Sequence, residues 1–169
     1  TKSINSGNIE ESHIYKSTFD YLCSPMLGGR EAGSDGSKLA AEYIVSSIDD
    51  KSSVVRNAFK YQDLELENII VYIPGYIDST IVVGAHYDSF PSRNNGFLPG
   101  ADDNVSGVSI LINLANQLLD KVIKYNVAIA FWDAEEIGRY GSKHFLETNN
   151  SNIVYYINID TCGNSYEYD

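Results

Sequence analysis

Imidazole and carboxylate side chains gather in one stretch of this sequence, between His86 and Asp103. His86 and Asp88 are two residues apart, so their side chains point the same way in an extended segment. Asp102 and Asp103 follow in a turn that begins after Gly100. Nitrogen and oxygen donors without a nearby thiolate favour Zn²⁺, with Mn²⁺ or Co²⁺ tolerated. The stretch therefore predicts one half of a metal site.

Three more carboxylates follow apolar runs further along the chain. Glu135 and Glu136 come after the run Val127–Trp132, and Asp160 comes directly after the run Ile153–Ile159. Ligands of open α/β sheets bind beyond the carboxyl ends of the strands. We therefore expect Glu136 and Asp160 to add one carboxylate each to the same site.

Three of these residues have distinct expected roles. Asp103 is placed to bridge two metal ions. A metal-bound histidine commonly donates its second ring N–H to a carboxylate, and Asp88 lies where it can accept that bond from His86. Glu135 neighbours an expected ligand. A free carboxylate in that position can take a proton from a metal-bound water and later pass it to a leaving amine.

Each of these residues, taken alone, has a simpler interpretation. His86 alone is typical of a structural histidine, and 102–104 alone is typical of a capping turn. The Glu-Glu pair alone is typical of a solvated loop, and Asp160 alone could end a strand. Because all of them fall at matching strand ends, the joint pattern favours a metal-hydrolase site.

Apolar periodicity indicates the elements that must position these side chains. Helical spacing predicts helices over 10–22, from Ser34 or Asp35 onward, over Ser106–Leu119 and near Gly141. The predicted strands are Val54–Tyr61, Glu67–Ile73, Thr80–Gly84, Val127–Trp132 and Ile153–Ile159. Their order predicts an α/β fold: a mixed, mostly parallel twisted sheet flanked by helices on both faces, in three layers. We expect one domain over residues 1–169, with residues 1–8 as a loose arm.

Charge and composition exclude some classes of partner. The chain of 169 residues has a formal net charge of −11, whereas nucleic-acid binding needs clustered Lys and Arg, so we expect no nucleic-acid partner. No apolar run approaches the roughly 18 residues needed to span a bilayer, so we expect no membrane partner. Cys23 and Cys162 show no CxxC spacing. A disulfide between them and two buried free thiols both stay open.

Several short motifs, in consistent order, resemble those of the M28 family of zinc-dependent aminopeptidases. The matching segments are GREAGS at 29–34, GAHYDS at 84–89, PGADDNVSG at 99–107, FWDAEEIG at 131–138, GS at 141–142 and NID at 158–160. The similarity covers nearly all of the chain after its first dozen or so residues. It implies a zinc-peptidase-like fold with two Zn²⁺ ions per site in the complete family pattern.

The resemblance also implies a role for each matching residue. The implied metal ligands are His86, Asp103, Glu136 and Asp160. Asp103 is the implied bridging ligand, preferred to Asp102 because the family's ligand is the acid directly before the Asn104 position. Glu135 matches the general base, and Asp88 matches the partner that orients the histidine. The resemblance further implies a cis peptide bond between Asp103 and Asn104.

One departure from the family pattern concerns a further histidine ligand. Family members continue past the Asp160 motif and supply this histidine near the end of the catalytic domain, whereas this sequence ends at Asp169. Neither His13 nor His144 matches that position. We therefore expect a catalytic domain that lacks its C-terminal part and holds two, one or no metal ions. Three explanations are open: a fragment, completion by a second chain or symmetric partner, or a fold that has lost turnover.

The resemblance implies a metallo-exopeptidase that removes N-terminal residues from peptide substrates. Hydrolysis would proceed through a metal-bridging hydroxide, with Glu135 as the general base. Two alternatives accompany this hypothesis: a glutaminyl cyclase-like enzyme that uses one zinc, and an inactive binding or assembly module of the same fold. Family habit and the absence of a starting methionine suggest a secreted or periplasmic location.

Overall fold

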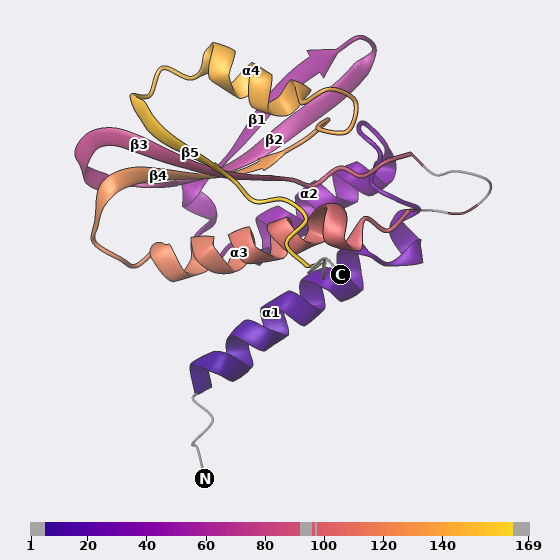
Figure 1. Ribbon diagram of the computed structural model, residues 1–169, viewed down its shortest axis with the longest axis horizontal. Coiled ribbons are helices and arrows are strands. Elements are labelled where there is room, and N and C mark those ends of the chain that lie inside the picture. Colours follow the sequence, from indigo (N-terminus) through magenta and orange to yellow (C-terminus); the bar gives the residue numbers. More distant parts are fainter. Residues whose placement is uncertain (1–5, 92–95, 97, 164–169) are drawn as a thin grey trace, which may run out of the picture.

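A five-stranded sheet lies between two layers of helices in the computed structural model, which describes residues 6–91, 96 and 98–163 (Figure 1). The helices are α1 (Ser6–Leu22), α2 (Asp35–Ser47), α3 (Gly107–Leu118) and α4 (Tyr140–Thr148). The strands are β1 (Val54–Tyr61), β2 (Leu64–Ile73), β3 (Gly75–His86), β4 (Ile123–Trp132) and β5 (Ile153–Asn158). Short helical turns are η1 (Pro25–Leu27), η2 (Lys51–Ser53) and η3 (Ala101–Ser106).

The sheet is mixed, with the strand order β1-β2-β4-β3-β5. Strand β2 runs antiparallel to β1 and β4, whereas β3 is parallel to both β4 and β5. The predicted mixed sheet, in which most strands point one way, is confirmed. In its parallel part, His86 lies opposite Trp132, and Gly84 lies opposite Asn158. The segments that follow β3, β4 and β5 therefore leave the sheet at the same edge.

Strand β4 shows why its apolar run is continuous. Ile129 and Phe131 point into the larger core, under the layer formed by α1, α2 and α3. Ala128 and Trp132 point to the opposite face, where Phe145 of α4 packs in a smaller core. Both faces of the strand are covered, so alternation of polar and apolar residues would bury polar groups. The prediction of helices on both faces is confirmed (Figure 1).

Helix α2 begins at a side-chain cap and packs closely on the preceding loop. Ser34 accepts a hydrogen bond at its Oγ from the backbone N–H of Ser37 at 3.1 Å, which confirms one of the two predicted caps. A Cβ at Gly36 would overlap the carbonyl oxygen of Gly29, so this helix start requires glycine. Ile44, further along the helix, is fully buried in the larger core.

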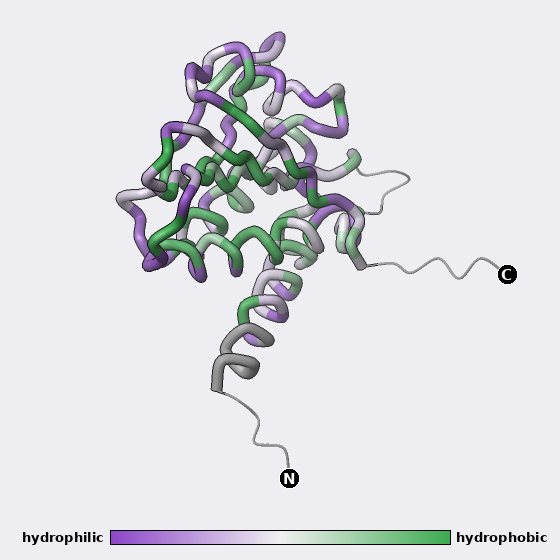
Figure 2. The backbone as a smooth tube through the Cα atoms, turned by 60° about the vertical axis from the view of Figure 1, so that its left-hand side comes forward, coloured by the Kyte–Doolittle hydropathy of each residue, from purple (hydrophilic) through white to green (hydrophobic). Residues whose placement is uncertain are grey.

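Helix α3 supplies the most apolar part of the helical layer. Its residues Val108, Leu111, Ile112 and Ala115 are fully buried. Figure 2 shows hydrophobic residues concentrated along this helix and in the interior strands. This helix follows η3, so its burial anchors the turn that carries Asp103.

Several elements extend beyond their predicted bounds. Strand β2 begins at Leu64 because its register with β1 continues to the pair Tyr61 and Leu64. Strands β3 and β4 pair from Gly75 and Ile123 onward. Their outer ends mix polar and apolar residues, so only pairing with a neighbouring strand defines them. Helix α1 begins at Ser6, inside the range expected to be a loose arm, and residues 1–5 lie outside the described residues.

Strand β5 lies at one edge of the sheet and leaves much of its surface exposed. Val154, Tyr155, Tyr156 and Ile157 are 41–64% exposed. Among the described residues, β5 pairs with β3 alone. An edge strand with this much exposed apolar surface is a ready template for further pairing.

The two cysteines and the apolar character of the helices bear on two other expectations. Cys23 and Cys162 are both free thiols, so no disulfide joins them. The expected burial is wrong for Cys162, which is exposed, and Cys23 is only half-buried. Burial raises the pKa of Cys23, against the opposing effect of Arg30. None of the described helices has the length and apolar character needed to cross a membrane.

Candidate metal centre

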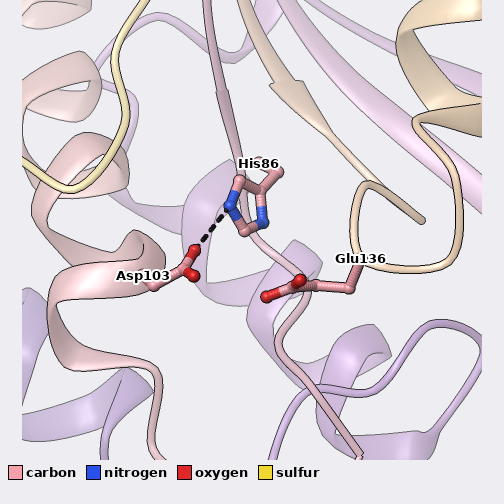
Figure 3. A group of neighbouring side chains, drawn as sticks. All are labelled: His86, Asp103 and Glu136. Atoms are coloured by element: carbon pink, nitrogen blue, oxygen red, sulfur yellow. Dashed lines mark hydrogen bonds and ion pairs between the residues drawn. The ribbon is translucent and has the colours of Figure 1, made fainter.

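His86, Asp103 and Glu136 converge from three different elements (Figure 3). His86 is the last residue of β3, Asp103 lies on η3, and Glu136 lies in the loop between β4 and α4. Each offers one ligand atom, and these atoms lie within 4.8 Å of one another. The Nε2 atom of His86 is 2.9 Å from Oδ1 of Asp103. Imidazole nitrogen and carboxylate oxygen at this spacing form a donor set that suits Zn²⁺.

Asp160 contributes a fourth side chain, and the third carboxylate, from the segment that follows β5. Its Oδ1 atom is 3.7 Å from Nε2 of His86. This oxygen and Oε1 of Glu136 are buried and have no hydrogen-bond partner among the described residues. A buried carboxylate oxygen without a partner is costly, so both atoms fit a site that holds a cation. The residues present therefore fit the metal ion that the sequence predicted.

Asp88 contacts both sides of this cluster. Its carboxylate is completely buried and accepts hydrogen bonds from the backbone N–H groups of Glu135 at 3.0 Å and Glu136 at 3.1 Å. Its Oδ1 atom also lies 3.4 Å from Nδ1 of His86, which is 3.2 Å from the Asp88 carbonyl oxygen. Spacing in the sequence indicated only the contact with the histidine. The hold on the two glutamates joins residues 47 and 48 positions apart, and no local signal could have revealed it.

The turn that presents Asp103 contains the expected cis peptide bond between Asp103 and Asn104. The buried Asn104 side chain donates from Nδ2 to the Ile159 carbonyl oxygen at 2.9 Å and accepts at Oδ1 from the Gly107 N–H at 3.0 Å. Ile159 directly precedes Asp160. Asn104 therefore ties the Asp103 turn to the segment that carries Asp160.

Asp102 takes part in a different contact from Asp103. Its Oδ1 atom accepts a hydrogen bond from the Gly163 N–H at 2.7 Å. Asp103 is thus the acid of this pair that contacts His86. This arrangement supports the preference for Asp103 as a ligand.

Burial and mutual repulsion disfavour the charged forms of the carboxylates in this cluster. Burial, followed by the charge of Asp103, raises the pKa of Glu136 to about 7. Burial also raises the pKa of Asp160, against the lowering effect of His86. Burial by itself would lower the pKa of His86, but its hydrogen bond with Asp88 and the surrounding negative charges raise it to about 9. A divalent cation at this position would relieve the repulsion among the carboxylates.

Glu135 lies beside the cluster and pairs with Arg139. Its side chain is 25% exposed, and Oε1 accepts a hydrogen bond from Nε of Arg139 at 2.9 Å. Arg139 has a φ of 60°, the left-handed conformation, which turns the loop before α4. Sequence reasoning did not identify this arginine as a partner of Glu135. The four-residue spacing of the opposite charges was the available signal.

The two other histidines lie outside the cluster. His144 on α4 stacks on Phe59 with ring centroids 5.0 Å apart. His13 on α1 lines a cavity of about 690 Å³ between α1, α2 and α3, and none of the residues lining that cavity belongs to the cluster. Within the described residues, neither histidine reaches the metal ligands.

A smaller cavity of about 450 Å³ opens directly at the cluster, between α4 and β5. His86 and Glu135 line it together with Trp132, Phe145 and Tyr156. A molecule bound there would lie against both an expected ligand and the expected base. The position of this smaller cavity, and not its size, makes it the relevant one.

Comparisons with known proteins identify the family and the fold of this chain. The sequence model of Peptidase family M28 matches residues 68–167. Aminopeptidase YwaD of Bacillus subtilis (strain 168) is 39% identical over 97 residues, which are 52% of this chain and 19% of that protein. The chain spans about a fifth of the length of the curated relatives that it matches.

Two solved structures share the fold. A Zn-dependent exopeptidase from Parabacteroides distasonis ATCC 8503 superposes with a TM-score of 0.72 at 23% identity, covering 89% of this chain and 62% of that one. The glutaminyl cyclase of Porphyromonas gingivalis superposes with a TM-score of 0.72 at 20% identity, covering 87% of this chain and 60% of that one. Identities this low show the fold alone. The family match, in contrast, spans more than half of the chain and includes every residue of the cluster, so the chain belongs to Peptidase family M28.

Proposed function

We propose that this chain carries the catalytic site of a zinc-dependent aminopeptidase, which hydrolyses the N-terminal peptide bond of peptide substrates. The observation that carries the proposal is the pair of buried, unpartnered carboxylate oxygens on Glu136 and Asp160, beside His86. Among the curated relatives, the matched protein of Bacillus subtilis is named an aminopeptidase. A secreted or periplasmic location, which the family resemblance suggests, stays part of this proposal.

The residues proposed to hold zinc are His86, Asp103, Glu136 and Asp160, with Asp103 bridging where two ions bind. Zinc supplies a Lewis acid that polarises the scissile carbonyl and makes water a better nucleophile at neutral pH. The protein's part is to hold these four donors at fixed spacing. Asn104 and Asp88 help to hold them through hydrogen bonds to the backbone of Ile159 and Glu136.

Glu135 is proposed to move the proton. Its carboxylate is partly exposed and lines the cavity at the cluster, so it can reach a water molecule there and a leaving amine. The N–H of Glu135 is held by the same Asp88 carboxylate that lies next to His86. One buried side chain therefore positions the base and a ligand together, which keeps their separation constant.

The test replaces Glu135 by Gln in the zinc-loaded chain. Hydrolysis of an aminoacyl anilide should fall by about 10²–10⁴-fold, the usual contribution of a general base, while zinc content measured by mass spectrometry stays unchanged. Glu147→Gln, at an exposed position on α4, is the control and should retain activity. Undiminished turnover in Glu135→Gln would remove the assigned role, and a wild-type chain that binds no zinc would contradict the whole proposal.

A glutaminyl cyclase-like activity is the second candidate, because a glutaminyl cyclase shares the fold with the same TM-score as the exopeptidase. The two reactions are separated by one substrate. A peptide with N-terminal Gln yields free glutamine by exopeptidase action, and ammonia with a cyclised peptide by cyclase action. A zinc-loaded chain that performs neither reaction would favour the third reading, a binding or assembly module.

We also infer that further polypeptide pairs with β5 in the active assembly. The exposed strand offers an open edge with Tyr155 and Ile157 on its surface. The chain covers 62% of the solved exopeptidase structure, so that protein has residues without a counterpart here. A second chain or a symmetric partner are both consistent with this edge.

A further inference from the structure

Arg30 lies fully buried in the loop between η1 and α2, and its guanidinium is bonded to backbone carbonyl groups. Its Nε donates to the Tyr87 carbonyl oxygen at 2.8 Å, and Nη1 donates to the Leu22 carbonyl oxygen at 2.7 Å. Nη1 also donates to the Pro99 carbonyl oxygen, and Nη2 donates to that of Gly100 at 3.2 Å. One side chain thus joins three segments that are far apart in the sequence.

Two of these segments carry expected metal ligands. Tyr87 directly follows His86 at the end of β3, and Gly100 precedes Asp103 by three residues on the way into η3. The Gly100 carbonyl oxygen also accepts from the Val105 N–H at 3.1 Å, so it belongs to the turn itself. The guanidinium therefore spans the gap between the two loops whose ends place Nε2 of His86 and Oδ1 of Asp103 2.9 Å apart.

Close packing at Gly100 shows how little freedom this link has. Its φ is +53°, and a Cβ there would lie 2.8 Å from Nη2 of Arg30 and 2.4 Å from the Asp103 carbonyl oxygen. Gly100 therefore lies against both the guanidinium of Arg30 and the backbone of Asp103. A side chain at this position would push the turn away from Arg30.

The backbone of Arg30 is itself fixed to the strand end. Its N–H donates to Oγ of Ser89 at 3.0 Å, and its carbonyl oxygen accepts from the Ser89 N–H at 3.1 Å. Ser89 directly follows Asp88, which holds Glu135 and Glu136. The contacts of Arg30 thus reach the segments of His86 and Asp103 directly, and the loop of Glu136 only through Asp88.

We propose that Arg30 is a positioning residue of the metal centre, whose planar fork of N–H donors sets the separation of His86 and Asp103. This inference rests on the proposed metal-dependent function and deepens it. Arg30 touches neither ligand and would act through the two loops. A lysine cannot replace it, because a single ammonium group cannot donate along the fixed directions of the guanidinium to carbonyls on different loops.

The charge of Arg30 and its geometry have opposite effects on metal affinity, which makes the proposal testable. The positive charge lies close enough to interact with Asp88, Asp103 and Glu136, so by itself it disfavours a further cation in the cluster. If charge were its only influence, a neutral variant would bind metal more tightly. If the fork sets the ligand spacing, every variant without the fork binds metal more weakly.

The experiment titrates the metal-free full chain with Co²⁺ and Zn²⁺ for three proteins: wild type, Arg30→Lys and Arg30→Met. Affinity is read by competition with a chromophoric chelator, and ligand geometry by the visible absorption of bound Co²⁺. Both variants should bind about 10–100-fold more weakly than wild type, with an altered Co²⁺ spectrum. Wild-type affinity in Arg30→Lys, or tighter binding by Arg30→Met, would overturn the proposal.

Two further variants separate positioning from general loss of stability. Ile44→Ala opens the larger core under α2, away from the cluster, and should lower the melting temperature without changing metal affinity. Ser89→Ala removes only the side-chain acceptor of the Arg30 N–H and is expected to fold even if the arginine variants do not. It should weaken metal binding by less than about 10-fold, below the range for groups that bond to metal ligands, because the guanidinium bonds to the two loops are kept.

The outcomes distinguish this inference from the proposed function. A wild-type chain that binds neither metal overturns both. A wild-type chain that binds metal, with Ser89→Ala and the folded Arg30 variants binding equally well, overturns the inference alone. Loss of affinity in Ile44→Ala equal to that in Arg30→Lys would likewise show that stability, and not positioning, controls the site.

Discussion

At the level of single residues, the site depends on buried polar groups that hold one another in place. Asp88 holds the backbone of Glu135 and Glu136, and a second buried carboxylate, Asp133, lies behind it. Asp133 accepts a hydrogen bond from the Ala134 N–H at 2.9 Å. Burial, followed by the charge of Asp88, raises the pKa of Asp133 to about 6. This carboxylate supports the loop of the glutamate pair and does not face the metal cluster.

The raised pKa of Asp133 predicts a specific dependence of stability on pH. Between about pH 4 and about pH 6, the folded chain keeps a proton that the unfolded chain has lost, so the free energy of unfolding falls as pH rises and then levels off. Asp133→Asn removes this titration. In this variant, the free energy of unfolding should therefore differ between about pH 4 and about pH 7 by roughly 1–3 kcal/mol less than in wild type. Urea unfolding of the metal-free chain measures this difference.

Asp78→Asn is the control for this measurement, because Asp78 is exposed. It should reproduce the wild-type dependence on pH. All other titratable groups are present in wild type and in both variants, so their contributions cancel when the pH dependences are compared. Equal slopes for Asp133→Asn and wild type would contradict the assigned pKa.

At the level of elements, the cluster is assembled from the ends of strands and from one turn. Parallel pairing places His86 opposite Trp132 and Gly84 opposite Asn158, so the segments after β3, β4 and β5 start from one edge. The turn η3 reaches that edge from the side and is tied to it by Asn104. The strand register therefore brings the three segments to the same edge of the sheet, and the hydrogen bonds of Asn104 fix the position of the turn relative to them.

Removing the Asn104 side chain should weaken both the fold and the site. Asn104→Ala removes the side-chain partner of the partly buried Ile159 carbonyl oxygen and of the Gly107 N–H, which should cost about 1–3 kcal/mol of stability. Metal affinity should also fall, because the turn is no longer tied to the segment of Asp160. Both quantities can be measured on the same sample, by chemical unfolding and by metal competition.

Asn116 of α3 offers a matched control for this variant. Its side chain makes the same two kinds of bond, accepting from the Asp49 N–H at 3.0 Å and donating to the Ser47 carbonyl oxygen at 2.9 Å, at a site remote from the metal ligands. Asn116→Ala should lower stability and leave metal affinity unchanged. An equal loss of affinity in both variants would show that the Asn104 bonds have no particular role at the site.

At the level of the whole molecule, the carboxylate cluster makes folding and metal binding mutually dependent. The chain has a net charge of −11. Burial, together with the charge of Asp103, raises the pKa values of Glu136 and Asp160. A cation bound by the folded chain alone stabilises it in proportion to the logarithm of its concentration. We propose that the chain is a single α/β domain whose unfolding is a single event linked to this binding.

Adding Zn²⁺ to the metal-free chain should therefore raise its melting temperature. At a free concentration about 100-fold above the dissociation constant, the stabilisation is about 2.7 kcal/mol, and a chelator should reverse it. Mg²⁺ at the same concentration is the comparison, because it prefers all-oxygen sites and should have a much smaller effect. A melting temperature that Zn²⁺ does not change, measured by calorimetry, would contradict a metal site in the folded chain.

The sequence by itself determined the number and order of the strands in the described residues, and the polar residues that follow them. Apolar runs are local signals, so β1 was predicted with its full bounds, and the residues His86, Asp103, Glu136 and Asp160 could be named from motif and position. The outer ends of β3 and β4 could not, because their residues are mixed in polarity and only pairing with each other makes them strands. Residue roles at the site stay predictions that the experiments above address.

Only the tertiary structure decided how the site is held together. The bonds from Arg30 to Pro99 and Gly100 join residues 69 and 70 positions apart, and the hold of Asp88 on Glu135 joins residues 47 positions apart. A hydrogen bond depends on the position of both groups in space, and neither residue type nor spacing along the chain encodes that position over such separations. Local chemistry therefore indicated which residues to expect in the candidate site, and long-range packing determined their distances and partners.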